Sequence, residues 1–271
     1  MNKEDLLKRL EELKALPKRS LGQNFLVSDH VVEKILQSVK VKEDLNLLEI
    51  GPGVGALTEH LVKIPCSNFR VIELDEAFAS YWRGRELEVI EADALQWGWG
   101  EAENQKSPTH LVSNLPYQIS APLVMELSSM GASWIQSMTL MFQKEVAERI
   151  VAVPKTKAYG TLSVVAQMRW NIKKVVDAGP ACFHPRPKVS SRVLNFQWNP
   201  EGEGSLAFLK FVRSGFLNRR KFLMKSLKGI SGGFDWEKAL TEMGLSTQVR
   251  AEELKPGEWF ELFRKFKGHG N

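Results

Sequence analysis

The spacing of apolar residues changes along the chain, and each change predicts a different kind of element. Near the N-terminus leucines recur three or four residues apart, which predicts an amphipathic helix over 3–16 that ends before Pro17. Apolar positions 31, 32, 35, 36 and 39 predict a second helix, and Ser28 stands where its N-terminal cap would be. The first forty residues are therefore expected to form two helices.

From residue 45 the pattern changes to short apolar runs separated by stretches with helical spacing. The runs are LNLLEI (45–50), NFRVIEL (68–74), LEVIEA (87–92), THLVSN (109–114) and SMTLMF (137–142), and the helical stretches are 56–63, 76–82 and 119–130. This alternation predicts a parallel sheet covered by helices. The loops after the strands would then share one edge, where such sheets bind ligands.

The end of the chain differs from the beginning. NIKKVVDAG (171–179) and SRVLNFQW (191–198) are candidates for two late strands, and NPEGEGS (199–205) has the composition of a linker. Beyond the linker only helical spacing occurs. We therefore expect an α/β domain over 1–200 that carries the chemistry and a small all-helical domain over 201–271.

Composition narrows the class of protein. No run approaches the 18 apolar residues that a membrane span needs, and the two cysteines and five histidines show no metal-binding or redox spacing. We expect a cytoplasmic, monomeric protein with no metal site and no membrane partner. Residues 205–230 contain seven basic residues and no acid, at positions 210, 213, 219, 220, 221, 225 and 228. This block, with Arg219, Arg220 and Lys221 at its centre, is either an RNA-binding surface or a solvated helix face.

A glycine loop follows the first predicted strand. Gly51, Gly53 and Gly55 lie between that strand and a helix, and Glu49 precedes them. Glycines in this position let a ligand approach the backbone closely. The G-x-G-x-G form with an acid at the strand end resembles the first motif of S-adenosylmethionine-dependent methyltransferases.

Two further strand ends carry acids that suit a nucleoside. Glu73 ends the second strand, 22 residues after Gly51, where an acid can accept both ribose hydroxyls. Asp93 follows the third strand and can accept from the exocyclic amine of adenine. Each acid alone is a common feature, but a loop, a ribose acid and a base acid in this order indicate a site for S-adenosylmethionine.

The fourth strand ends in the sequence Asn-Leu-Pro-Tyr. An adenine amine is a weak nucleophile, and two acceptors on its N–H groups would aim its lone pair and stabilise the developing positive charge. The Asn114 side-chain oxygen and the Leu115 carbonyl can be these acceptors. Pro116 lacks an N–H that would compete for them, and Tyr117 offers a face on which an extruded base can stack. The alternative is an ordinary Asn-Pro turn beside a core tyrosine.

Motifs along nearly the whole chain resemble the KsgA family of small-subunit ribosomal RNA adenine dimethyltransferases. They are LGQNFL (21–26), EIGPGVGALT (49–58), VIELD (71–75), ADAL (92–95), NLPYQIS (114–120), QKEVAERI (143–150), YGTLSV (159–164), FHPRPKVSSRV (183–193) and FLNRRKFL (216–223). The resemblance implies a Rossmann-like methyltransferase domain with a small helical C-terminal domain, and a role in ribosome biogenesis. It implies dimethylation of two adjacent adenosines in a hairpin loop near the 3′ end of the small-subunit RNA.

Some residue roles rest on this resemblance alone. It places Asn24 and Leu26 beside the cofactor, together with Gly51, and it stacks Phe183 on the target adenine opposite Tyr117. The chain departs from the family pattern at Ser190, where aspartate is usual, and at Lys225, where asparagine is common. Three alternatives remain open: a large-subunit adenine methyltransferase, a DNA adenine methyltransferase, and a non-catalytic RNA-binding assembly factor of the same fold.

Overall fold

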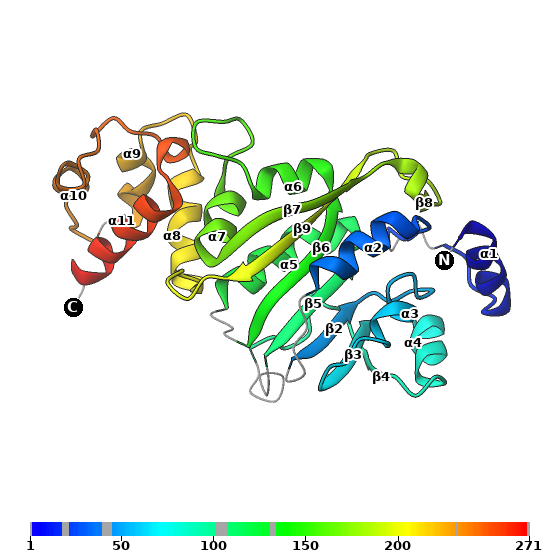
Figure 1. The fold of residues 1–271 in the computed structure, drawn as a ribbon. Coiled ribbons are helices and arrows are strands. Elements are labelled where there is room, and N and C mark those ends of the chain that lie inside the picture. Colours follow the sequence, from blue (N-terminus) through cyan, green and yellow to red (C-terminus); the bar gives the residue numbers. More distant parts are fainter. Residues whose placement is uncertain are drawn as a thin grey trace. The chain divides into compact units, whose positions relative to one another are not determined.

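Seven strands form one mixed sheet in the computed structural model of the chain (Figure 1). They are β2 (Asn46–Ile50), β3 (Asn68–Glu73), β4 (Glu88–Glu91), β5 (Thr109–Asn114), β6 (Ile135–Gln143), β7 (Trp170–Ala178) and β9 (Ser191–Trp198), in the spatial order β4-β3-β2-β5-β6-β9-β7. The structure describes residues 2–17, 22–39, 45–100, 108–130, 134–230 and 232–269, so Leu21 of the LGQNFL motif lies outside the described residues.

The predicted parallel core of the sheet is confirmed. Strand β2 pairs in parallel with β3 and β5, β3 with β4, and β5 with β6. Strand β9 runs antiparallel to β6, with Leu140 opposite Leu194, so the complete sheet is mixed rather than wholly parallel. A separate two-stranded sheet, which was not predicted, joins β1 (Phe25–Leu26) to β8 (Phe183–His184).

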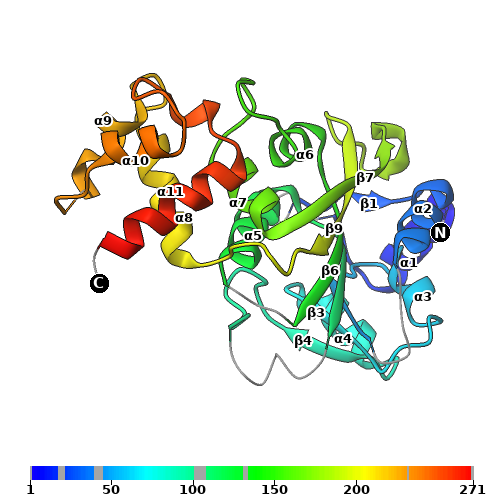
Figure 2. The same cartoon turned by 60° about the vertical axis from the view of Figure 1, so that its left-hand side comes forward.

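Helices cover the sheet in the first of two compact units, which comprises residues 1–123, 132–147 and 172–198. The helices that begin in it are α1 (Lys3–Glu12), α2 (Asp29–Ser38), α3 (Thr58–Leu61), α4 (Glu76–Arg83), α5 (Tyr117–Ser129) and α6 (Lys144–Ile150). Helices α2 and α3 pack on one face through a shared apolar cluster with the strands, and α5 lies on the other side of the sheet (Figure 2).

Local sequence explains how the first two helices begin and end. The Asn2 side chain accepts from the Asp5 N–H at 3.0 Å, and the Asp5 carboxylate accepts from the Asn2 N–H, so α1 starts with a capping box. The predicted extension of this helix to residue 16 is wrong, because the backbone enters the left-handed region at Lys14 (φ 49°). The predicted Ser28 cap of α2 is confirmed by its acceptance from the Val31 N–H.

The second compact unit is all-helical apart from its ends. It comprises residues 124–131, 148–171 and 199–271, and its helices are α7 (Thr161–Arg169), α8 (Leu206–Phe216), α9 (Leu223–Leu227), α10 (Trp236–Glu242) and α11 (Pro256–His269). Three short 3-10 helices occur in the chain, at Pro180–Cys182, Lys228–Ile230 and Ala251–Glu253. Aromatic side chains such as Phe208, Phe211 and Trp259 fill the core of this unit.

The predicted boundary near residue 200 marks the last passage of the chain into the second unit. Two earlier segments, 124–131 and 148–171, also belong to that unit. The division into domains 1–200 and 201–271 stays a prediction about which parts fold independently. Within the described residues, no helix combines the length and apolar character that crossing a bilayer requires.

Candidate active site

A pocket of about 260 Å³ opens at the carboxyl ends of four parallel strands in the first unit. Its lining consists of residues 22–26, 49–54, 56–57, 72–74, 92–94 and 114–119. All the predicted cofactor residues are in this lining, as are Leu115 and Tyr117 of the predicted amine site. Strand topology thus brings together side chains that lie as much as 90 residues apart in sequence.

The glycine loop has backbone conformations that side chains would disturb. Gly53 and Gly55 have φ values of 50° and 95°. A Cβ atom at Gly55 would lie 2.6 Å from the Trp82 ring, and one at Gly53 would lie 3.0 Å from the Phe25 ring. The Trp82 indole N–H donates to the Gly53 carbonyl at 2.9 Å. The loop is therefore packed closely on its outer side, which leaves its inner side as the wall of the pocket.

Glu73 is fixed at the end of β3 by two backbone donors. Its carboxylate oxygens accept from the Gly53 N–H at 3.1 Å and from the Asp75 N–H at 2.8 Å. A carboxylate has about four acceptor positions, so these bonds orient the group and leave capacity for two hydroxyl donors. Burial raises the pKa of Glu73, while the two backbone N–H groups act in the opposite direction.

Asp93 is held in a similar way after β4. One of its carboxylate oxygens accepts from the Leu95 N–H at 2.9 Å, in a tight turn. The side chain is partly exposed and lines the pocket. It can therefore offer its remaining acceptor positions to an amine donor.

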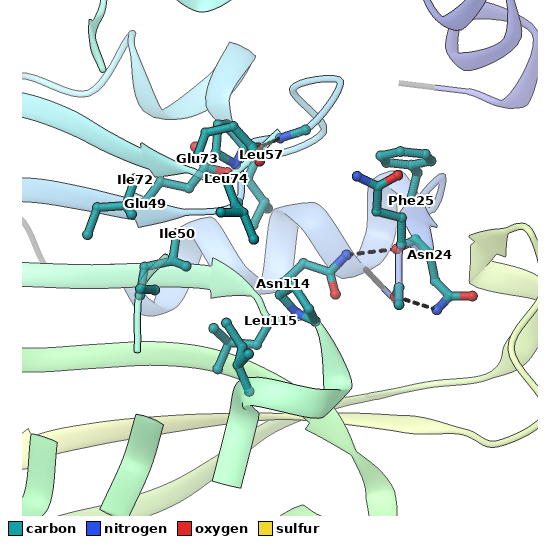
Figure 3. Close-up of a pocket in the computed structure, with 18 of the residues that line it drawn as sticks. Asn24, Phe25, Glu49, Ile50, Leu57, Ile72, Glu73, Leu74, Asn114 and Leu115 are labelled. Carbon is teal, nitrogen blue, oxygen red and sulfur yellow. Dashed lines mark hydrogen bonds between the residues drawn. The ribbon is translucent and has the colours of Figure 1, made fainter. Parts of the chain in front are cut away.

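The Asn114 amide is oriented by the segment opposite it. Its Nδ2 donates to the Asn24 carbonyl at 3.1 Å, and Asn24 in turn donates through its own amide to the Gly22 carbonyl at 2.9 Å (Figure 3). Because the amide nitrogen is engaged, the Asn114 oxygen is the end of the side chain that remains to accept a hydrogen bond. The buried Leu115, whose carbonyl is the other predicted acceptor, follows directly.

The donor set fits S-adenosylmethionine. The pocket combines a loop wall without side chains, two carboxylates with acceptor positions left, and an amide oxygen, and these suit the backbone, hydroxyl and amine groups of such a nucleoside.

A family model described as ribosomal RNA adenine dimethylase matches residues 15–267 of the chain. The chain belongs to this family. The ribosomal RNA small subunit methyltransferase A of Bdellovibrio bacteriovorus is 43% identical over 275 residues, which cover 98% of each chain. The protein of the same name from Cupriavidus necator is 36% identical and covers 93% of this chain and 92% of its own length.

Solved structures agree with the fold. A dimethyladenosine transferase from Plasmodium falciparum matches with a TM-score of 0.75 and 23% identity, covering 91% of this chain and 98% of its own. The 23S rRNA methyltransferase ErmE matches with a TM-score of 0.65 and 25% identity, covering 90% and 100%. The predicted family, Rossmann-like fold and S-adenosylmethionine dependence are confirmed, and the chain is a ribosomal RNA adenine dimethyltransferase.

The two aromatic residues predicted to hold the target base differ in their surroundings. Tyr117 lines the pocket, and its hydroxyl lies 2.8 Å from the Ser191 hydroxyl, which fixes the direction of the ring. Burial raises the Tyr117 pKa, so the phenol stays neutral. Phe183 is 2% exposed, belongs to the apolar cluster under α2 and is not part of the pocket lining. Its stacking role stays a prediction.

The three predicted RNA-binding residues also differ from one another. The Arg219 guanidinium pairs with Glu252 at 2.5 Å and donates to the carbonyls of Lys157 (2.8 Å) and Thr156 (2.9 Å), all within the second unit. Arg220 and Lys221 are exposed. Sequence reasoning gave all three residues the same role, because a charge block does not show which of its cations have internal partners.

Glu49 was noted in the sequence but was not assigned to the site. It lines the pocket, is 2% exposed, and its Oε2 atom has no hydrogen-bond partner among the described residues. Burial, assisted by the nearby Glu73 carboxylate, raises the pKa of Glu49 to about 8. The signal was its place directly before the glycine loop, but only the structure shows that it is buried at the pocket wall.

Proposed function

We propose that this chain transfers methyl groups from S-adenosylmethionine to N6 of adenosines in the RNA of the small ribosomal subunit, and dimethylates each target. The choice of the small subunit is supported by the relatives named as small-subunit methyltransferases, which match over nearly their whole length. The 23S methyltransferase ErmE is less similar, at 25% identity. The finer target, two adjacent adenosines in a hairpin loop near the RNA 3′ end, rests on the motif resemblance.

The orientation of Asn114 is the observation that carries the chemistry. Its Nδ2 donates to the Asn24 carbonyl, so its oxygen can accept one N–H of the target amine. The Leu115 carbonyl is placed to accept the other. Together they hold the nitrogen lone pair toward the donor and stabilise positive charge as it develops on N6.

No general base is required in this proposal. When bound, S-adenosylmethionine supplies an electrophilic methyl group on a sulfonium. The nitrogen becomes cationic on methylation and loses its proton readily, so the two acceptors need only orient and stabilise. This fits a pocket whose lining contains no histidine and no cysteine.

Tyr117 completes the target site in this proposal. Its ring offers a face for stacking, and base–aromatic stacking contributes about 1–3 kcal/mol per base. The Ser191 hydroxyl limits rotation of the ring, so the stacking face is formed before RNA binds. The side chains of Glu73 and Asp93, with the glycine loop, Asn24 and Leu26, hold the nucleoside of the cofactor.

A labelled-methyl assay tests the proposal. The pure protein is incubated with radiolabelled S-adenosylmethionine and with either small or large ribosomal subunits that lack adenine methylation. We expect label in the small-subunit RNA, recovered after nuclease digestion as N6,N6-dimethyladenosine. Label in large-subunit RNA alone would contradict the choice of substrate, and no label in either would favour a non-catalytic assembly factor.

A further inference from the structure

The N-terminal helix α1 lies against the outer side of the glycine loop. Its apolar face buries Leu6 and Leu10, which are 0% and 5% exposed, in a cluster with Phe25, Val54 and Phe78. Val54 belongs to the glycine loop, and Phe25 belongs to the segment that carries Asn24. The helix therefore packs where two walls of the pocket meet.

One side chain of α1 binds the loop directly. The Arg9 guanidinium donates to the Val54 carbonyl at 2.7 Å, forms an ion pair with Glu59 at 2.8 Å, and lies 5.7 Å from the centre of the Tyr81 ring. Val54 lies between the two glycines with positive φ, and Glu59 lies in α3, directly after the loop. Arg9 thus connects the loop to the helix that follows it.

The loop is held from three directions. Glu73 accepts from the Gly53 N–H on the pocket side, and the Trp82 indole donates to the Gly53 carbonyl. Arg9 supplies the bond at Val54, the next residue. Glycine-rich backbone loses much conformational freedom when it is ordered, so a ligand that binds this loop benefits when the protein has ordered it beforehand.

We propose that Arg9 is a positioning residue for the cofactor loop, and that α1 orders this loop before S-adenosylmethionine binds. The inference rests on the proposed use of this loop as the cofactor site. Arg9 does not line the pocket and acts through the backbone of residues 53–55. Its loss changes cofactor affinity and leaves the rate of methyl transfer at saturating cofactor unchanged.

The test compares Arg9→Ala and Arg9→Lys with Lys8→Ala. Lys8 is an exposed cation next to Arg9 on the same helix, so its removal controls for charge and for helix content. Arg9→Lys retains the charge beside Glu59 and much of the apolar stem but lacks the planar donor group, and it serves if Arg9→Ala does not fold. Two quantities are measured in full-length protein: calorimetric affinity for S-adenosylmethionine, and amide hydrogen exchange of residues 50–57 without cofactor.

We expect Arg9→Ala to weaken cofactor binding by about tenfold, as expected for loss of one charge-assisted hydrogen bond, and to speed exchange of the loop amides. Arg9→Lys should give a smaller loss, and Lys8→Ala should match wild type in both measurements. Unchanged affinity and exchange in both Arg9 variants would overturn the proposal, as would an equal loss in Lys8→Ala. A lower melting temperature with unchanged affinity would overturn it as well.

The exchange measurement separates this inference from the proposed function. If wild type does not bind S-adenosylmethionine, the proposed cofactor site fails. Loop exchange in the free protein still reports whether Arg9 orders residues 50–57.

Discussion

The strand-end pocket and the basic segment 210–228 are both rich in polar side chains, but the protein holds these side chains differently. In the pocket, Glu73 and Asp93 accept from backbone N–H groups and Asn114 donates to a backbone carbonyl, so each is fixed and keeps acceptor capacity. In the basic segment, Arg219 is engaged by Glu252 and two carbonyls, whereas Arg220 is exposed.

The difference shows which sequence signals carry positional information. Parallel pairing places the ends of β2, β3 and β5 at one edge, so the order of motifs along the chain predicts their arrangement in space. A run of cations has no such constraint. Its members point in different directions around α8, α9 and the loop between them, and their partners are set by contacts distant in sequence.

The largest expected effect is at Asn114. If the pocket side chains are fixed in order to act on the amine, Asn114→Ala should slow methyl transfer in a single turnover by about 10²-fold, by analogy with loss of one oxyanion-hole donor. Affinity for the small subunit should change far less. A rate within threefold of wild type would mean that the amide only holds the Asn24 segment in place.

Glu73 should show the next largest effect, on binding rather than on rate. Glu73→Ala removes the acceptor of the Gly53 and Asp75 N–H groups as well as the predicted ribose acceptor. Hydrogen bonds to a charged group contribute about 1.5–3 kcal/mol each, so we expect at least tenfold weaker S-adenosylmethionine binding by calorimetry. Circular dichroism should show that the variant remains folded. Unchanged affinity in a folded variant would remove Glu73 from the site.

Local sequence was sufficient to locate most elements of the sheet. The runs 109–114 and 191–198 match β5 and β9 residue for residue, because strand ends coincide with polar or turn-forming residues. The direction of β9 could not be predicted, since its apolar pattern is the same whether it runs parallel or antiparallel to β6. The inclusion of 124–131 and 148–171 in the second unit depends on long-range packing that no local pattern records.

The candidate site was predictable to the extent that strand ends determine it. Glu73, Asp93 and Asn114 follow from topology together with residue type. The burial of Phe183 and the internal partners of Arg219 depend on residues 25–75 positions or more away in sequence or on a separate pair of strands. The same holds for the Arg9 contact with Val54, which joins residues 45 positions apart.

A pH dependence of cofactor affinity would sharpen the contrast, because it depends on a side chain buried in the pocket. Glu49 has a pKa raised to about 8, so its carboxyl is mainly protonated at pH 7 in the free protein. A cationic cofactor favours the ionised form and lowers this pKa, so the complex binds fewer protons than the free protein. Affinity should therefore rise by several-fold from pH 6 to pH 8 and level off above the folded-state pKa.

Glu49→Gln is the control for this prediction, because glutamine keeps the shape but does not titrate. Calorimetry at pH 6, 7, 8 and 9 should give a rising affinity for wild type and a flatter profile for the variant. The same raised pKa means that ionisation in the unfolded chain, above about pH 4.3, opposes folding. The free energy of unfolding should therefore fall for wild type between that pH and 8, and fall less for Glu49→Gln. Parallel profiles for the two proteins would show that another group titrates.

The smallest effects are expected in the basic segment, and they should differ between neighbouring residues. Arg220 and Lys221 are exposed and free to face RNA phosphates, and each phosphate contact releases condensed counterions. Changing both to alanine should weaken small-subunit binding a few-fold and reduce the salt slope by about one for each contact, with an unchanged melting temperature. Lys238→Ala, an exposed cation of α10 outside the segment, is the matched control.

Arg219→Ala should behave in the opposite way. It removes the ion pair with Glu252 and the donors to the Thr156 and Lys157 carbonyls, which should cost roughly 1–3 kcal/mol of unfolding free energy and loosen the 153–158 loop. Its effect on the salt slope should be small, because a guanidinium with three internal acceptors has little left to offer a phosphate. Binding titrations at three salt concentrations, together with melting curves, separate the two behaviours. If Arg219→Ala instead flattened the salt slope as much as the Arg220–Lys221 double variant, the internal partners would have to release the guanidinium when RNA binds. The charge block would then act as one surface, as the sequence alone predicted.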